Sequence, residues 1–111
     1  MIISGLVGND TAEKILLYLE NYNSGYPRAI AQKFEISLSQ VQKQLERLER
    51  EGIVVSNLIG KTRVYKWNTR CFFLTELRTI LSKSLTLLPE TILEKYFRDR
   101  TRPRRKGKPL R

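Results

Sequence analysis

Apolar side chains recur at helical spacing in the first third of the chain and predict two helices there. Asp10 and Glu13 have the spacing of a capping box, with Asp10 as the N-cap and Glu13 at the third helical position. The apolar side chains that follow predict a helix over about residues 11–22: Ile15, Leu16, Leu19 and Tyr22. Pro27 suits the first turn of a second, short helix, whose predicted inner face comprises Ala29, Ile30, Ala31 and Phe34.

The third predicted helix has the most regular pattern. Ser37 and Gln40 form another capping box, and Gly52 is a good C-terminal stop. Between them the apolar residues fall at spacings of three, four and three: Leu38, Val41, Leu45 and Leu48. The rest of the helix is polar, with mostly hydrogen-bonding side chains: Ser39, Gln40, Gln42, Lys43, Gln44, Glu46, Arg47 and Arg50. We expect this helix to pack through its stripe and to present the polar face outward.

The second half of the chain changes from a period of two to a helical period. Residues 53–59 and 62–67 are rich in β-branched and aromatic residues and flank Gly60-Lys61, which predicts a β-hairpin with a basic tip. A long helical stripe then runs from Arg70 to Leu88, and residues 89–97 restart as a short last helix after Pro89. The predicted fold is mainly α with a two-stranded β-hairpin wing, a winged helix-turn-helix with extra C-terminal helices.

The chain has 111 residues, enough for one domain, and a formal net charge of +10. Residues 1–60 carry six basic and seven acidic side chains, whereas residues 61–111 carry fifteen basic and four acidic ones. Eight of those basic side chains lie in residues 98–111, beside a single acid. This tail has too few apolar residues to offset its ordering entropy, so we predict a folded domain over residues 1–97 and a disordered basic tail.

Composition argues against several classes of protein. There is one Cys and no His, which excludes an internal disulfide framework, most zinc sites and His-based catalysis. We find no Gly-rich phosphate loop and no nucleophile–base pair, so we expect no catalytic residues, no enzyme activity, no cofactor and no metal. The N-terminal residues make a poor signal peptide and no apolar run is long enough to span a bilayer, so we expect a cytoplasmic protein without a membrane partner.

The predicted helix–turn–helix and hairpin suit double-stranded DNA. The third helix is narrow enough for the major groove, where its outer side chains would meet base edges, while the hairpin tip and the start of the second helix would hold phosphates. Tail cations would add contacts without sequence preference. The candidate DNA-binding residues are Arg28, Ser39, Gln40, Gln42, Lys43, Gln44, Arg47, Lys61, Arg63, Arg102, Arg104, Arg105 and Lys106.

Two segments resemble a known family. The helix–turn–helix core lies in residues 30–54 and has the pattern Ile30-Ala31, Leu38-Ser39, Val41, Leu45, Leu48 and Gly52-Ile53-Val54. The wing is Gly60-Lys61-Thr62-Arg63-Val64-Tyr65-Lys66-Trp67-Asn68. Together, over about residues 11–70, they resemble the ArsR/MarR-like winged-helix transcription regulators. The resemblance implies a prokaryotic, dimeric DNA-binding regulator. The ArsR metal sensors use Cys pairs and His/Asp sets, which this chain lacks, so metal sensing is not implied.

The sequence leaves three questions about partners open. The long helix has more apolar residues than one packed face needs, which favours a homodimer interface built from this helix and from Ile92, Leu93, Tyr96 and Phe97, with Ile2, Ile3 and Leu6 as further candidates. Alternatively, the last helix folds back over that surface. The near-neutral charge of residues 1–60 also leaves open a protein-interaction module with only secondary or nonspecific nucleic-acid binding. The tail could instead bind RNA, acidic lipid or an acidic protein.

Overall fold

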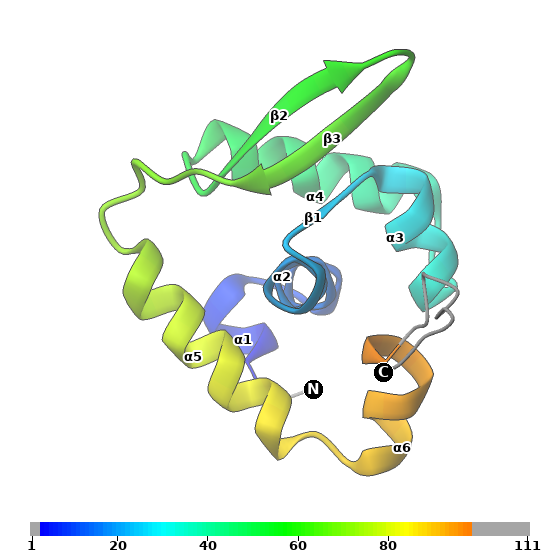
Figure 1. The fold of residues 1–111 in the computed structure, drawn as a ribbon, viewed down its shortest axis with the longest axis vertical. Helices are drawn as coiled ribbons and strands as arrows, with labels where there is room; N and C mark the ends of the chain where they lie inside the picture. Colours follow the sequence, from blue (N-terminus) through cyan, green and yellow to red (C-terminus); the bar gives the residue numbers. More distant parts are fainter. Residues whose placement is uncertain (1–2, 99–111) are drawn as a thin grey trace, which may run out of the picture.

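The computed structural model describes residues 3–98. Helix α2 lies at the centre of the fold, with the other helices and the sheet arranged around it (Figure 1). The helices are α1 (Ser4–Val7), α2 (Asp10–Tyr22), α3 (Pro27–Phe34), α4 (Leu38–Arg50), α5 (Leu74–Leu87), α6 (Glu90–Ile92) and the π-helical turn η1 (Leu93–Phe97). The strands are β1 (Ser24–Gly25), β2 (Val54–Ile59) and β3 (Thr62–Trp67). The predicted fold class is therefore confirmed.

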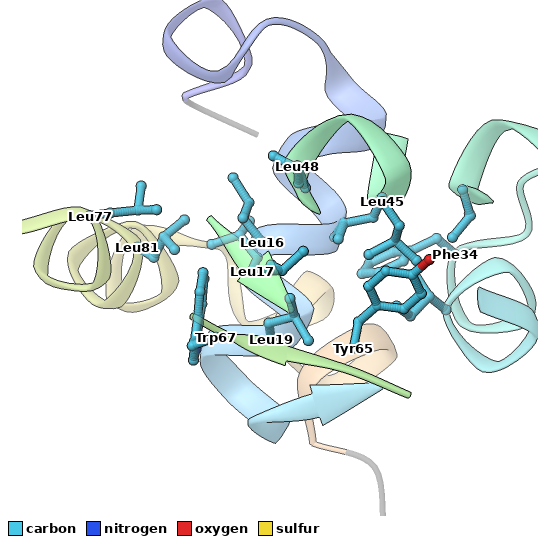
Figure 2. Close-up of a cluster of buried hydrophobic side chains, with 14 of the residues drawn as sticks. Leu16, Leu17, Leu19, Phe34, Leu45, Leu48, Tyr65, Trp67, Leu77 and Leu81 are labelled. Carbon is cyan, nitrogen blue, oxygen red and sulfur yellow. The ribbon is translucent and has the colours of Figure 1, made fainter. Parts of the chain in front are cut away.

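Helix α2 is central because it is apolar on nearly every side. Ala12, Ile15, Leu16, Leu17 and Leu19 are all at most 1% exposed. A helix with apolar side chains around its whole circumference must be enclosed by other elements. Figure 2 shows the side chains of α2 meeting those of α4, α5 and β3 in one cluster.

The predicted N-cap of α2 is wrong. Asn9, not Asp10, caps the helix: its Oδ1 accepts a hydrogen bond from the backbone N–H of Ala12 at 2.7 Å. Glu13 does not reach back to the cap, because its side chain is fully buried and its Oε2 accepts a hydrogen bond from the N–H of Ile3 at 2.9 Å. The carboxylate of Glu13 thus accepts from the backbone just before α1 instead of from the cap of its own helix.

The predicted helix–turn–helix is confirmed. Helix α3 has Pro27 in its first turn and ends at Phe34, and its C-cap Glu35 adopts a left-handed conformation with φ of 58°. Ser37 caps α4 as predicted, since its Oγ accepts from the backbone N–H of Gln40 at 3.2 Å. Val41, Leu45 and Leu48 of the stripe are buried against the core, and Leu38 is partly buried.

The predicted hairpin is confirmed, and it gains a third strand that the sequence pattern did not predict. Strands β2 and β3 pair antiparallel from Val54 opposite Trp67 to Ile59 opposite Thr62. The two-residue β1 adds to the other edge of β3, so the sheet order is β1-β3-β2. Gly25 of β1 is required there, because a Cβ would lie 2.6 Å from Cε1 of Tyr18. A strand made of two turn-forming residues has no period to detect.

The long predicted helix is shorter than expected. It begins at Leu74 rather than at Arg70, because Asn68 directs the chain into a turn: its Oδ1 accepts from the N–H of Arg70 at 3.0 Å and its Nδ2 donates to the carbonyl of Gly52 at 2.8 Å. The four-residue helix α1 was not predicted either.

The C-terminal segment folds back onto its own domain. Phe97 is only 4% exposed and its ring centroid lies 5.9 Å from that of Phe34. Its backbone carbonyl accepts from Nδ2 of Asn21 at 2.7 Å, and the carbonyl of Tyr96 accepts from the Tyr22 hydroxyl at 2.9 Å. The segment therefore folds back onto α2 and α3, but it does not cover the apolar surface of α5, where Ile80 and Leu87 stay exposed. The alternative that the last helix covers that surface is thus not borne out, and the homodimer stays a prediction. Phe97 is therefore covered by its own chain and is not an exposed interface residue.

Candidate nucleic-acid interface

The first half of α4 presents an exposed polar face. Ser39, Gln40, Gln42 and Lys43 are all exposed, and the buried stripe behind them fixes the helix on the domain. Grooves border this half of the helix on both sides, so its exposed side chains lie between two hollowed surfaces.

The groove on the wing side brings together residues from three elements. It has a volume of about 350 Å³ and is lined by Tyr26, Pro27, Arg28, Leu38, Gln42, Lys61, Thr62 and Arg63. Arg28 lies in the first turn of α3, Gln42 on α4, and Lys61 and Arg63 at the wing. No side chain caps the N-terminus of α3, so its first backbone N–H groups add a partial positive charge to the same groove.

The groove on the other side of α4 is more neutral. It has a volume of about 340 Å³ and is lined by Asn9, Asp10, Thr11, Gln40, Lys43 and Gln44. Lys43 is the cation of this groove and Asp10 is its acid. Gln40 and Lys43 therefore point to one side of the helix and Gln42 to the other, so the exposed face of α4 is broad enough to contact both walls of a wide nucleic-acid groove.

The wing carries cations without acids. Residues 54–67 contain Lys61, Arg63 and Lys66 and no Asp or Glu. Arg63 is held in place because its Nη1 donates to Oγ of Ser56 at 3.0 Å, and that hydroxyl donates to Oε2 of Glu49 at 2.8 Å. Glu49 thus connects the wing to α4.

Tyr65 and Trp67 at the base of the wing are core residues, as predicted, at 4% and 7% exposure. Burial raises the pKa of the Tyr65 hydroxyl above its usual value, and the nearby carboxylate of Glu49 raises it further. The base of the wing therefore contributes no negative charge at neutral pH, and its net charge is set by the lysine and arginine side chains nearer the tip.

Gln44 and Arg47 are only half-exposed and are held by hydrogen bonds, although Gln44 also lines the more neutral groove. The guanidinium of Arg47 donates from Nε to Oε1 of Gln44 and from Nη2 to the carbonyl of Val7, both at 3.0 Å. Its Nη1 lies 3.6 Å from Oε2 of Glu51. Nδ2 of Asn9 also donates to Gln44, at 3.1 Å. Both side chains thus hold α4 to the junction of α1 and α2, and their predicted contact with DNA stays untested.

No sequence signal separates these two residues from their neighbours. Gln44 and Arg47 have the same chemistry as Gln42 and Lys43 and lie on the polar side of the same helix. What distinguishes them is the proximity of α1, which is too short to show a helical period. The predicted tail residues Arg102, Arg104, Arg105 and Lys106 lie outside the described residues.

A second surface, away from the grooves, is apolar. Leu6 of α1 and Ile80 and Leu87 of α5 are 67%, 38% and 72% exposed, and Phe72 just before α5 is 92% exposed. Leu6 and Ile80 also border a cavity of about 470 Å³ between α1, α4 and α5. We call Leu6, Phe72, Ile80 and Leu87 the α5 patch. Within residues 3–98, no helix has both the length and the apolar character needed to cross a membrane, and no group of potential ligands is placed to hold a metal ion.

Helices α2, α3 and α4 followed by the β2–β3 hairpin are the arrangement that defines a winged helix-turn-helix domain. No protein-family model and no curated protein sequence matches the chain. Solved structures, however, share its fold.

A MarR-family transcriptional regulator from Rhodococcus sp. RHA1 matches with a TM-score of 0.57 and 16% identity, over 84% of this chain and 71% of that one. A point mutant of S. aureus MepR, bound to an oligodeoxyribonucleotide, matches with a TM-score of 0.54 and 17% identity, over 84% and 75% of the two chains. ZitR of Lactococcus lactis matches with a TM-score of 0.55 and 21% identity, over 76% and 71%. The chain therefore has the winged-helix fold that MarR-family regulators use. This similarity supports the MarR part of the sequence resemblance and does not specifically support the ArsR part.

Proposed function

We propose that this protein is a sequence-specific double-stranded DNA-binding protein, a prokaryotic transcription regulator that acts as a homodimer in the cytoplasm. One observation carries the proposal: the fold brings Arg28, Gln42, Lys61 and Arg63 from three separate elements to one groove beside the exposed face of α4. Three cations and an amide, from elements far apart in the sequence, thus border one groove, which suits the phosphates and base edges of a duplex.

In this proposal, the first half of α4 enters the major groove. Gln40, Gln42 and Lys43 are exposed and are of the types that hydrogen-bond to base edges. Arg28 with the N-terminus of α3 holds a phosphate on one side, and Lys61 and Arg63 of the wing hold the adjacent backbone or minor groove. The oligonucleotide-bound MepR structure supports the proposal, because a protein with the same fold binds DNA.

The α5 patch supports the homodimer. Phe72 and Leu87 are so exposed that burying them in an interface would be favourable. A second copy provides such an interface, because a two-fold axis brings the same surface of both copies together. Two copies related by a two-fold axis would present two α4 helices to half-sites about 34 Å apart, or one turn of duplex. The interface proposed is thus narrower than the sequence suggested, since Phe97 is buried within its own chain and Ile92, Leu93 and Tyr96 are half-buried against it.

The basic tail adds affinity without sequence preference. Its eight cations would neutralise phosphates and release counterions, so their contribution should fall steeply with salt. The domain itself, over residues 1–97, has thirteen basic and ten acidic side chains, too small an excess to bind DNA strongly by charge alone. Specificity and nonspecific attraction would therefore come from different parts of the chain.

The test is selection of bound sequences from a random duplex pool, with the full chain and with a variant ending at residue 97. We expect a palindromic motif from both proteins, and uniformly weaker binding with a flatter salt dependence for the shorter one. A tail deletion that changes the motif would contradict the proposed role of the tail.

Failure of both proteins to enrich any duplex would contradict the proposed function. A stable complex with another protein through the α5 patch would then favour the interaction-module alternative. Preferential binding of structured RNA, in competition with duplex DNA and lost with the tail, would favour the RNA alternative.

A further inference from the structure

The tip of the wing is apolar as well as basic. Leu58 and Ile59, the last two residues of β2, are 61% and 63% exposed, although a hairpin tip of a small domain has no need of large apolar side chains. The tip projects well beyond α3 and α4 (Figure 1), and every residue from 57 to 63 is exposed. Nothing within the described chain covers these two side chains.

The two side chains lie on opposite faces of the hairpin, because consecutive residues of a strand alternate. Leu58 is opposite Arg63 in the register, on the face that continues inward to the buried Tyr65 and Trp67. Ile59 is opposite Thr62, on the other face. Each face of the tip therefore ends in one exposed apolar side chain, with Lys61 at the turn between them.

The surrounding charge identifies the kind of partner. The hairpin has three cations and no acid, and Arg63 and Lys61 line the groove that also contains Arg28 and Gln42. A polyanion whose surface is apolar between its charges fits such a tip, and a DNA minor groove has that character: its walls are deoxyribose rings and its rims are phosphates. A protein or lipid partner for the two apolar side chains alone would not account for their place beside the candidate DNA-binding groove.

We propose that Leu58 and Ile59 form an apolar wedge that enters the minor groove beside the α4 contact and bends the duplex. This inference rests on the proposed function. The minor groove of B-DNA is only about 6 Å wide. Two paired strands are already about 4.8 Å apart between backbones. A tip with a large side chain on each face must therefore widen the groove, and apolar wedges that do so unstack base steps and bend DNA toward the major groove.

The experiment measures bend and affinity together. The probe is a duplex of about three helical turns that carries the sequence most enriched by the full chain, with a fluorescence donor and acceptor at its ends. The full-length protein is compared with the double variant Leu58→Thr/Ile59→Thr, which keeps β-branched residues in the strand while removing most of the apolar surface. Asn57→Thr, on the same strand, is the matched control. Circular dichroism of each variant checks that it folds.

We expect the unaltered protein to bend the duplex by at least about 20°. The double variant should lose most of that bend and bind about tenfold more weakly, whereas Asn57→Thr should do neither. Lys61→Ala should weaken binding and flatten the salt dependence yet keep the bend, which separates the wedge from the charge.

Three results would overturn the wedge, and they are distinguishable. If the full chain binds no duplex, the proposed function fails and the wedge fails with it. If the full chain binds and the double variant bends the duplex equally, the wedge alone is wrong. If the double variant keeps the bend but changes the oligomeric state in sedimentation velocity, the tip is a protein contact instead.

Discussion

The two halves of α4 carry the same kinds of side chain and use them differently. In the first half, Gln40 and Lys43 are exposed along a groove and make no side-chain hydrogen bond that holds them to the described part of the protein. In the second half, Arg47 makes hydrogen bonds to Gln44 and to the carbonyl of Val7 and pairs with Glu51. The difference teaches that the free face of a helix is decided by its neighbours. Here the neighbour is α1, a single turn that packs beside only one half of α4.

The largest effect should come from substitutions in the first half of α4. The double variant Gln40→Ala/Lys43→Ala removes two candidate base contacts, each worth about 1–3 kcal/mol of discrimination, so binding to the selected duplex should fall at least about thirtyfold. The free energy of unfolding should stay within about 0.5 kcal/mol of the original, because both side chains are exposed. Electrophoretic shifts on the selected duplex and on a scrambled one measure the affinity, and urea unfolding measures the free energy of unfolding.

A scrambled duplex is the informative control for that variant. If binding to the selected and scrambled duplexes falls by the same factor, the two side chains contact phosphates rather than bases, and the first half of α4 is not a reading surface.

A smaller effect, on stability, should come from substitution of Arg47 in the second half of α4. Arg47→Ala should lower the free energy of unfolding by about 2 kcal/mol, since hydrogen bonds from a charged donor are lost while part of the side chain is solvent-screened. DNA affinity of the folded protein should change less than about threefold. Urea unfolding and the same electrophoretic shift check both values. Arg50→Ala, an exposed arginine on the same helix, is the control and should leave stability nearly unchanged.

A different result for Arg47→Ala would contradict a purely structural role for the second half of α4. Unaltered stability of Arg47→Ala together with a large loss of specific binding would mean that Arg47 leaves the carbonyl of Val7 in the complex and contacts DNA.

The smallest effect should come from the cap beside the second half of α4. Asn9→Ala removes the hydrogen bond to the N–H of Ala12 and the contact with Gln44, and should cost about 1 kcal/mol of stability in thermal or urea unfolding. Asp10→Ala should cost less, since Asp10 lies in the first turn and does not cap the helix. A larger loss for Asp10→Ala would show that the capping box predicted from the sequence forms in solution.

The elements that could be predicted from the sequence are those in which one local signal is strong. The stripe of α4, its Ser37 cap and the β2–β3 hairpin depend on period and on turn residues, and the structure confirms all three. Helix α1 and strand β1 span four and two residues, too few for any period, and their places are set by tertiary contacts. Asn9 and Asp10 are both good capping residues, so their order could not be resolved locally.

The sequence predicted which kinds of side chain belong to the candidate site, but it could not tell which individual residues are exposed there. Arg28, Gln42, Lys61 and Arg63 lie around one groove, which the sequence did not predict, and their contact with DNA stays a prediction. Gln44 and Arg47 have suitable chemistry but face the unpredicted α1. The exposed Leu58 and Ile59 were assigned only to a strand, because their exposure depends on how far the hairpin extends past the core.

The end of η1 is fixed to the domain, which limits how far from it the residues that follow can extend. Asn21 and Tyr22 hold the last turn against Phe34, at the end of α3, and Glu90 and Glu94 pair with Arg98 directly afterwards. Thirteen residues follow Arg98, so their far end lies at most about 45 Å from it. Helix α3 itself is about 12 Å long. In the proposed function, the aromatic contact at Phe97 therefore anchors the basic residues after Arg98 within reach of the groove at the start of α3 and raises their effective concentration there.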